Sequence, residues 1–394
     1  MKVLILTESF APTVAGPSER AVAISRLLRN AGHRVDVLTM RPFGGNSAKD
    51  YEALEYADSV LYAGGDGIRN LKYNKKFKLV SALNNWFVSL PGPYWIESVL
   101  LWRKFKKVAI ANHWDVMWVT SPPHEVHNAA IKIKSEYGIP YVMDLRDPWV
   151  GGKRIRTRSK IHDWFTSRLF SKAIKAADSI VTNTPGFYSE FVGQNPQSAS
   201  RTFCIPNGYF EQDAVGLASY LAVESKSVFK LVYSGSAYQG VVPDKIELVI
   251  DRLNCLDLLI DAEVIGPLRH SRQYKSLGSL SPHASMGHVM SSDLLFLHMP
   301  YDAEGQSVMS LKSYIYARSG AIILYSGPKN ETSDFLERYS KVYYLDYGID
   351  WGEVAAALKQ GRDSNRKISQ NDIVDQSWES RMTVINEILQ SLGT

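Results

Sequence analysis

The first forty residues of the chain pair a short apolar run with an amphipathic segment. Lys2 to Leu6 carries four consecutive apolar residues, which is typical of a parallel strand buried on both faces. The apolar positions of residues 18–30 then recur at helical spacing. Ser18 is the expected N-cap of this helix and Gly32 its expected terminator. With a second strand from Arg34 to Thr39, the segment predicts one β-α-β unit.

The same alternation of strands and helices continues along the chain and predicts an α/β fold with parallel sheets. The pattern weakens between residues 212 and 227, which we interpret as an interdomain linker. The prediction is therefore two Rossmann-like domains, at 1–211 and 228–376, and a final segment, 377–394, that is largely helical. The remaining expected strands are 115–120, 140–145, 179–182, 202–205, 229–233, 262–265, 294–297, 321–324 and 342–345.

Length and composition agree with this organisation and narrow the function. The chain has 394 residues, too many for one ordinary core. Its formal net charge of +5 is too small for a dedicated nucleic-acid binder, but it suits anionic substrates or an anionic membrane surface. The two cysteines have no metal-ligand spacing and are too few for a disulfide framework, so we expect a cytoplasmic protein. The N-terminal apolar run is too short for a signal peptide, and no stretch is long enough to span a membrane.

Candidate ligand-binding residues follow the strands of the first half, because ligands of open parallel sheets bind beyond the carboxyl ends of the strands. Gly16-Pro17-Ser18 leads from the first strand into a helix N-terminus, where backbone amides can face a phosphate or a hydroxyl-rich ligand. Arg146-Asp147-Pro148-Trp149 follows another strand and offers an arginine and a carboxylate for a sugar or phosphate. A plain βα turn and a structural ion pair remain the alternatives. His124 follows the strand at 115–120 and is a third candidate.

The second half contains a candidate phosphate site. Ser234-Gly235-Ser236 and Gly266 follow two of its expected strands. A long polar loop then precedes a helix near Lys312, whose dipole and amides would stabilise charge on a leaving phosphate. A surface lysine is the alternative. The loop residues expected at the phosphates are Gln306, Ser307, Val308 and Ser310.

Several common motifs are absent from the sequence. There is no P-loop lysine motif and no G-x-G-x-x-G, which disfavours an ATPase or a simple dehydrogenase. There is no D-x-D pair, and His124 and His127 lack the i, i+4 spacing of a zinc helix. We therefore predict neither a metal nor a cofactor.

Two segments combine features of a membrane-facing surface. Residues 77–108 carry tryptophans, tyrosine and phenylalanines beside lysines, and residues 153–160 form a basic cluster. Aromatics mixed with cations suit the interface of a bilayer. A solvated basic face, with the aromatics packed in the core, is the alternative. The sequence leaves this choice open.

In their order along the chain, these motifs resemble the signature of family-four retaining glycosyltransferases of the GT-B architecture. The resemblance spans nearly the whole chain and is stronger in the first half. The matching segments are 4–12, Gly16, 27–39, 121–123, 139–149, 177–182, 205–208, 233–236, 265–267, 312–320 and 377–379.

The resemblance implies two Rossmann-like domains facing each other across a cleft, with a nucleotide-sugar donor in the C-terminal domain and an acceptor in the N-terminal one. It implies that the last helix packs back on the N-terminal domain. It implies retention of anomeric configuration without a metal, because a basic side chain and backbone amides stabilise the leaving diphosphate. Lys312 matches a donor-site lysine, and Arg146 and Asp147 match active-site positions.

The resemblance also assigns the remaining candidates to two sites. Arg146, Asp147 and Lys312 are the candidate catalytic residues. The donor-site candidates are Ser234, Gly235, Ser236, Gly266, Gln306, Ser307, Val308 and Ser310. The acceptor-site candidates are Gly16, Pro17, Ser18, His124 and Trp149. The acceptor itself is expected to be a glycan, a lipid-linked intermediate or a small molecule, and the enzyme is expected to contact an anionic membrane peripherally.

Two positions depart from the family pattern. Ile315 stands where a glutamate usually holds the donor ribose. The basic residue usually found shortly after Ser236 is missing, although Lys245 is nearby. These departures keep two alternatives open: a catalytically weak nucleotide-binding homologue or partner subunit, and a nucleotide-sugar epimerase.

Overall fold

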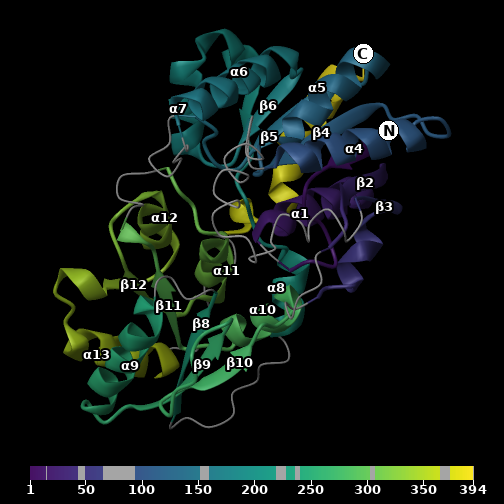
Figure 1. Cartoon of the computed structure of the whole chain (residues 1–394). Helices are drawn as coiled ribbons and strands as arrows, with labels where there is room; N and C mark the ends of the chain where they lie inside the picture. Colours follow the sequence, from purple (N-terminus) through teal and green to yellow (C-terminus); the bar gives the residue numbers. More distant parts are fainter. Residues whose placement is uncertain are drawn as a thin grey trace, which may run out of the picture. The chain divides into compact units, whose positions relative to one another are not determined.

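The computed structural model divides the chain into two compact units. It describes residues 1–14, 16–42, 49–64, 94–150, 159–218, 228–235, 240–301, 307–363 and 373–393. Unit 1 contains Met1–Pro206 together with Arg381–Thr394, and unit 2 contains Asn207–Ser380. Each unit is built around one sheet with helices against it (Figure 1). The predicted α/β fold with two parallel-sheet domains is confirmed.

Unit 1 contains a seven-stranded parallel sheet in the order β3-β2-β1-β4-β5-β6-β7. Leu4 and Leu6 of β1 pack into a core with α4, α5, α6 and α7, while Val3 and Ile5 point to the opposite face and are also fully buried. Burial on both faces explains the continuous apolar run. The strands are β1 (Lys2–Leu6), β2 (Arg34–Met40), β3 (Ser59–Ala63), β4 (Val116–Ser121), β5 (Tyr141–Leu145), β6 (Ser179–Thr182) and β7 (Thr202–Cys204). The helices are α1 (Gly16–Asn30), α4 (Trp95–Val108), α5 (Val126–Tyr137), α6 (Lys160–Ala176), α7 (Pro185–Gln194) and α14 (Met382–Leu392).

Unit 2 contains a six-stranded parallel sheet in the order β10-β9-β8-β11-β12-β13. The order reverses at β8, whose neighbours are β9 on one side and β11 on the other. The strands are β8 (Val228–Ser234), β9 (Leu259–Ile265), β10 (Lys275–Gly278), β11 (Leu294–His298), β12 (Ile322–Ser326) and β13 (Val342–Tyr344). The helices are α8 (Glu211–Ala218), α9 (Val241–Asn254), α10 (Pro282–Met290), α11 (Leu311–Ser319), α12 (Glu331–Tyr339) and α13 (Trp351–Asp363).

The segment expected to be a linker differs from the prediction. Residues 211–218 form helix α8, which packs on α10 in unit 2, so the expected linker does not begin at residue 212. The segment is a short amphipathic helix with few polar positions, so the sequence pattern did not reveal it. Its Ala214 is fully buried. The first unit also ends earlier in the sequence, at Pro206, and then resumes at Arg381. Residues 381–393, including α14, therefore belong with unit 1 (Figure 1, yellow).

The start of α1 also differs from the prediction. The helix begins at Gly16, so Ser18 lies inside its first turn and is not the N-cap. The Ser18 hydroxyl donates instead to the carbonyl oxygen of Thr13, 2.6 Å away. The predicted end of the helix is confirmed, because α1 stops at Asn30 and Gly32 adopts a φ of 84°.

A fully buried ion pair joins α1 to the middle of the sheet in unit 1. The Nε and Nη2 atoms of Arg20 lie 2.8–3.0 Å from the carboxylate oxygens of Asp144 on β5. Both side chains are completely buried. Arg20 Nη2 also donates to the carbonyl oxygen of Ile205, and Trp118 Nε1 donates to Asp144. The pair ties α1, β4, β5 and the end of β7 together.

The part of the chain that the structure describes contains no helix long and apolar enough to cross a membrane. The described residues include only part of the aromatic segment at 77–108. Residues 77–93 lie outside the described residues, whereas Trp102 and Phe105 of α4 are buried in the core of unit 1. For these two aromatics, core packing is the correct interpretation. Of the basic cluster, Lys160 begins α6 and residues 153–158 lie outside the described residues.

Candidate functional site

The carboxyl edge of the sheet in unit 2 brings two predicted donor-site residues together. Gly235 directly follows β8, and Lys312 lies in the first turn of α11. The Lys312 Nζ lies 4.9 Å from the centre of the Tyr233 ring, and a Cβ built on Gly235 would overlap it. Glycine at position 235 therefore leaves room for the lysine ammonium.

Gly266 completes this close packing at the ends of β8 and β9. Its φ is 130°, and a Cβ there would overlap the carbonyl oxygen of Gly235. The amide of Gly235 in turn donates to the carbonyl oxygen of Ile265 at 2.8 Å. At the point where the strand order reverses, backbone packs directly on backbone with no side chain between. Ligands of such sheets bind at this point.

A second lysine occupies the same edge as part of a hydrogen-bonded cluster. Lys245 of α9 donates to Ser326 Oγ and to Asp346 Oδ1, each at 2.6 Å. Asp346 also accepts from the amide of Gly327 at 2.7 Å. His298 Nδ1 lies 3.0 Å from Ser326 Oγ. We call Lys245, His298, Ser326 and Asp346 the lysine cluster.

The charges of the lysine cluster are set by its surroundings. Burial, and next the nearby Lys245 ammonium, lower the pKa of His298 to about 4, so this imidazole is neutral at pH 7. Burial raises the pKa of Asp346, but hydrogen bonds from Lys245 and Gly327 outweigh it and leave the pKa below its ordinary value. Among the described residues, Lys245 and Lys312 bring two ammonium groups to this edge and Asp346 brings one carboxylate. That balance suits an anionic ligand.

Sequence reasoning found only part of this edge. Lys245 was noted as a substitute for the missing basic residue. His298 was missed because the strand was expected to end at Leu297, one residue short. His298 and Ser326 are the last residues of β11 and β12, and this position at a strand end is the feature by which both could have been predicted.

The other predicted donor-site residues either make hydrogen bonds within unit 2, are half-buried, or lie outside the described residues. The amide of Ser310 donates to Thr332 Oγ1 at 3.1 Å, and the carbonyl of Val308 accepts from the same hydroxyl at 2.7 Å. The Ser310 amide is therefore engaged within unit 2, and its contact with a phosphate stays a prediction. Ser234 bonds Ser285 and Tyr316. Ser307 is half-buried, and Ser236 and Gln306 lie outside the described residues.

In unit 1, the structure brings Arg146 and Gly16 together. Arg146 Nη1 donates to the carbonyl oxygen of Gly16 at the start of α1. Burial lowers the pKa of Arg146, although the nearby Asp147 carboxylate opposes the shift. The Nε of Arg146 is buried and has no hydrogen-bond partner within the described residues. Asp147 is exposed, and of Pro17 only the backbone is described.

Two predicted acceptor-site side chains are used inside the protein. Ser18 is buried and bonds Thr13, as described above. Trp149 is only 5% exposed and belongs to the core of unit 1, where its ring stacks on His124 at 5.1 Å between centroids. Both side chains are thus engaged inside unit 1, and their contact with an acceptor stays a prediction. The rings of α5 and of its preceding turn cover Trp149.

His124 belongs to a chain of hydrogen bonds behind Arg146, which we call the histidine chain. The Tyr141 hydroxyl lies 2.6 Å from His127 Nδ1, and burial raises the pKa of this phenol well above its ordinary value, so it stays protonated. His127 Nε2 in turn lies 3.0 Å from Ser121 Oγ. Ser121 Oγ also lies 3.1 Å from His124 Nδ1. The rings of His124 and His127 both contact Trp149, so the histidine chain supports the loop that carries Arg146.

Acid should destabilise unit 1 through the histidine chain. Burial, and next the Arg146 charge, lower the pKa of His124 to about 3; burial also lowers that of His127 well below 6.5. Between about pH 3 and 6.5 the unfolded state then binds more protons, so this contribution to stability falls as the pH falls through that range. The free energy of unfolding from urea titrations at pH 5 and pH 7 measures the slope.

The exposed His113 provides the control, since its side chain is 87% exposed. We expect His124→Gln to reduce the difference between pH 5 and pH 7, and His113→Gln to leave it unchanged. Equal slopes for wild type and His124→Gln would contradict a neutral His124 in the folded protein.

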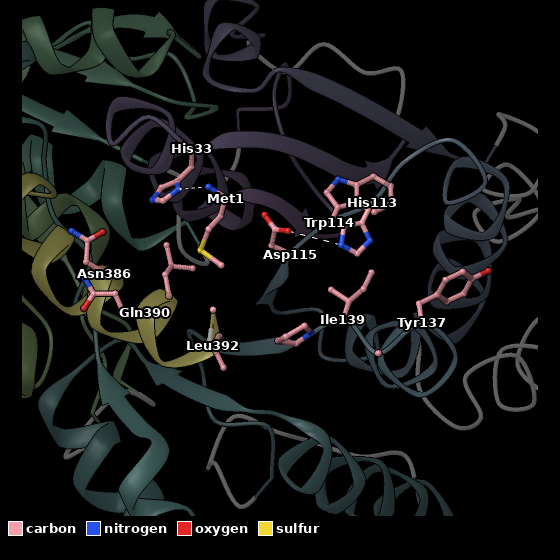
Figure 2. A pocket seen from close by; sticks show the side chains of 14 residues that line it. Met1, His33, His113, Trp114, Asp115, Tyr137, Ile139, Asn386, Gln390 and Leu392 are labelled. Atoms are coloured by element: carbon pink, nitrogen blue, oxygen red, sulfur yellow. Dashed lines mark hydrogen bonds and ion pairs between the residues drawn. The ribbon is translucent and has the colours of Figure 1, made fainter.

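A pocket of about 800 Å³ lies at the opposite edge of the sheet in unit 1 (Figure 2). Its walls are the residues just before β1, β2, β4 and β5, together with α14. The terminal amine of Met1 and His33 Nδ1 lie 3.3 Å apart in it. Because ligands of open parallel sheets bind at the carboxyl edge, this amino-edge pocket is not the candidate active site. The described residues contain no group of three or more side chains able to hold a metal ion.

Comparisons with known proteins agree with the fold. Residues 15–208 match the family model of the glycosyl transferase 4-like domain. A trehalose-6-phosphate synthase, OtsA, is similar in structure with a TM-score of 0.67, at 14% identity and over 99% of both chains. No curated protein matches the sequence.

Two further solved structures show the same fold. An α,α-trehalose-phosphate synthase (UDP-forming) from Burkholderia xenovorans, in complex with glucose-6-phosphate, has a TM-score of 0.65 at 12% identity and covers 99% of this chain and 100% of its own. The catalytic domain of starch synthase IV from Arabidopsis thaliana, bound to ADP and acarbose, has a TM-score of 0.57 at 11% identity and covers 100% and 99%. Residues 15–208 thus match the glycosyl transferase 4-like domain, and the whole chain shares the GT-B fold of these structures.

Proposed function

We propose that the protein transfers a sugar from a nucleoside-diphosphate-sugar to an acceptor, with retention of anomeric configuration and without a metal. The observation that carries the proposal is the pair of ammonium groups, Lys312 and Lys245, at the carboxyl edge of unit 2. Lys312 lies beside the backbone of Gly235, and Lys245 lies beside Ser326 at the end of β12. Ligands of open parallel sheets bind at this edge. Two cations offset the charge of a diphosphate in the way a metal otherwise would.

The roles of individual residues follow from their positions. Lys312 stabilises the negative charge that develops on the departing diphosphate, aided by the positive end of the α11 dipole. Lys245 is held in place by Asp346 and Ser326, so its ammonium is preorganised. In the transfer step the bond from the anomeric carbon to the phosphate oxygen breaks, and the acceptor oxygen forms the new bond on the same face. The acceptor proton passes to the departing phosphate.

Unit 1 supplies the candidates for acceptor binding. Arg146 lies at the N-terminus of α1 with a buried Nε that has no hydrogen-bond partner among the described residues, and Asp147 beside it is an exposed carboxylate. An arginine donor and a carboxylate acceptor are the groups that bind sugar hydroxyls or a phosphate. We propose a sugar-bearing, lipid-linked or small-molecule acceptor. Trehalose-phosphate synthases with this fold are named for a phosphorylated sugar, which is one small-molecule class to include in tests.

One observation favours a second candidate function, a nucleotide-binding homologue with weak catalysis. Ile315 of α11 packs against the core of unit 2. An apolar side chain at this position cannot accept a hydrogen bond from the donor ribose. Nucleotide binding then rests on the contacts to the diphosphate, and a donor whose ribose is not held in position reacts slowly.

Titration with a panel of nucleoside diphosphates and their sugars, by calorimetry in the presence of EDTA, tests the proposal. We expect one base to bind clearly more tightly than the others, with an affinity that chelation does not change. Incubation of that donor with an acceptor panel, followed by NMR of the anomeric proton, then reports transfer and configuration.

Other outcomes separate the alternatives. Binding without transfer or hydrolysis supports the weak homologue, and a changed sugar without any acceptor supports an epimerase. Affinity that is lost in EDTA, or no nucleotide binding at all, would overturn the proposed donor site.

A further inference from the structure

Helix α6 (Lys160–Ala176) of unit 1 buries one side and exposes large apolar side chains on the other. Ala173 and Ile174 are buried in the core. Near the start of the helix, Ile161 is 50% exposed, Trp164 57% and Phe165 36%. At 100° per residue, positions 161, 164 and 165 fall on one side of the helix.

This grouping is unusual for the described part of unit 1. Its other exposed large apolar residues, Met1, Tyr51, Ile110 and Tyr137, lie apart from one another in the sequence and on different elements. Single exposed apolar residues are normal and need no explanation. Three within five residues of one helix form a patch, and patches mark contact with a partner or a membrane.

Cations occupy the same side of the helix. Arg168 and Lys172 follow Trp164 and Phe165 at intervals of four and seven residues, and both are exposed. The Arg168 guanidinium lies 5.5 Å from the centre of the Trp164 ring. The helix contains four lysine or arginine residues (160, 168, 172 and 175) and one acid (163), a net charge of +3. We call Ile161, Trp164, Phe165, Arg168 and Lys172 the α6 face.

We propose that the α6 face binds an anionic phospholipid surface, with the helix lying in the plane of the membrane. Trp164 and Phe165 would enter the headgroup region, and the cations would contact lipid phosphates. The mixture of aromatics and cations on one face favours a membrane over a protein partner, because the centre of a protein interface is depleted of charged residues such as lysine. Figure 1 shows α6 beside α7 in unit 1.

The α6 face differs from the surface that the sequence suggested. The expected aromatics at 77–108 include Trp102 and Phe105, which are buried in the core. The proposal also stands apart from the proposed transfer reaction, because it uses none of the residues at either candidate site. Membrane binding and donor binding can therefore fail independently.

Flotation of the purified protein with vesicles tests the proposal. We expect binding to vesicles that contain phosphatidylglycerol and little binding to vesicles of phosphatidylcholine alone. Replacing both aromatics, Trp164→Ser with Phe165→Ser, should weaken binding at least about tenfold, because the inserted apolar area is lost. Arg168→Glu should weaken it further as salt-dependent attraction is lost.

Two matched controls use exposed residues away from the α6 face. Ile110→Ser removes an apolar side chain that is 89% exposed, and Lys329→Ser removes an exposed cation of unit 2. Both should bind vesicles as the wild type does. All variants should keep the wild-type unfolding midpoint and nucleotide affinity, since only exposed side chains change.

Three outcomes would overturn the proposal. The first is that the wild-type protein does not bind anionic vesicles. The second is binding that the double aromatic variant leaves unchanged. The third is self-association in light scattering that disappears in the double variant without any vesicle binding, which would make the α6 face a protein interface.

Discussion

Replacing Lys312 with alanine is expected to lower the turnover of sugar transfer by about 10²–10³-fold, the usual effect of removing one preorganised group that stabilises developing charge. The Lys312 ammonium lies over the Tyr233 ring and against Gly235, at the end of the strand where the diphosphate is proposed to bind. Steady-state kinetics with the donor identified by titration measure the loss. Nucleotide affinity should also fall, because the same ammonium contacts the ground-state diphosphate.

Lys329→Ala is the matched control for Lys312. Lys329 is an exposed lysine of unit 2 whose Nζ lies 3.5 Å from Glu337 Oε1. Its removal should leave turnover unchanged. Gly235→Ala offers a second way to disturb the same ammonium, since the new Cβ would displace the Lys312 Nζ. Turnover of Lys312→Ala within about threefold of the wild type would place the departing phosphate elsewhere.

The largest expected effect on stability is that of Arg20→Ala. Both members of the Arg20–Asp144 pair are fully buried, so removing the guanidinium leaves a carboxylate uncompensated inside unit 1. Breaking such a pair typically costs about 3–5 kcal/mol. Hydrogen exchange of the β5 amides measures the loss in unit 1, and the β12 amides of unit 2 serve as an internal reference.

Two further variants separate burial from charge attraction. Arg269→Ala breaks an exposed pair with Asp244, and it should change stability by less than about 1 kcal/mol. Arg20→Met combined with Asp144→Leu should recover most of the stability that Arg20→Ala loses, because no charge is then left buried. A mild effect of Arg20→Ala alone would mean that water or another cation reaches Asp144.

The sequence predicted the central elements of both sheets because these are covered on both faces. Such strands read as continuous apolar runs, and β1 and β6 have the predicted bounds. The edge strands β3 and β10 were missed. The sequence of β10 has a single apolar residue, so no apolar run marks it, whereas β3 carries the run Val60–Ala63 and was overlooked.

The candidate site was predictable only where a glycine directly follows a strand or a lysine lies at the start of a helix. Gly235 and Lys312 were found in this way, and the structure brings them together. The packing of Trp149 was not predictable, because the rings around it, His124 and His127, come from another part of the chain. The hydrogen bonds among Lys245, Ser326 and Asp346 join residues that are far apart in the sequence, so no local pattern reveals them.

The chain passes between the two units twice, at residues 206–207 and 380–381, and the two passages lie together in unit 2. The amide of Trp378 donates to the carbonyl oxygen of Tyr209 at 2.8 Å, and Gly208 fits tightly against the backbone of residues 376–378. Unit 2 is therefore an insertion with adjacent ends, the arrangement that tolerates transplantation between proteins. During synthesis it can fold before the ribosome has delivered α14, the last helix of unit 1.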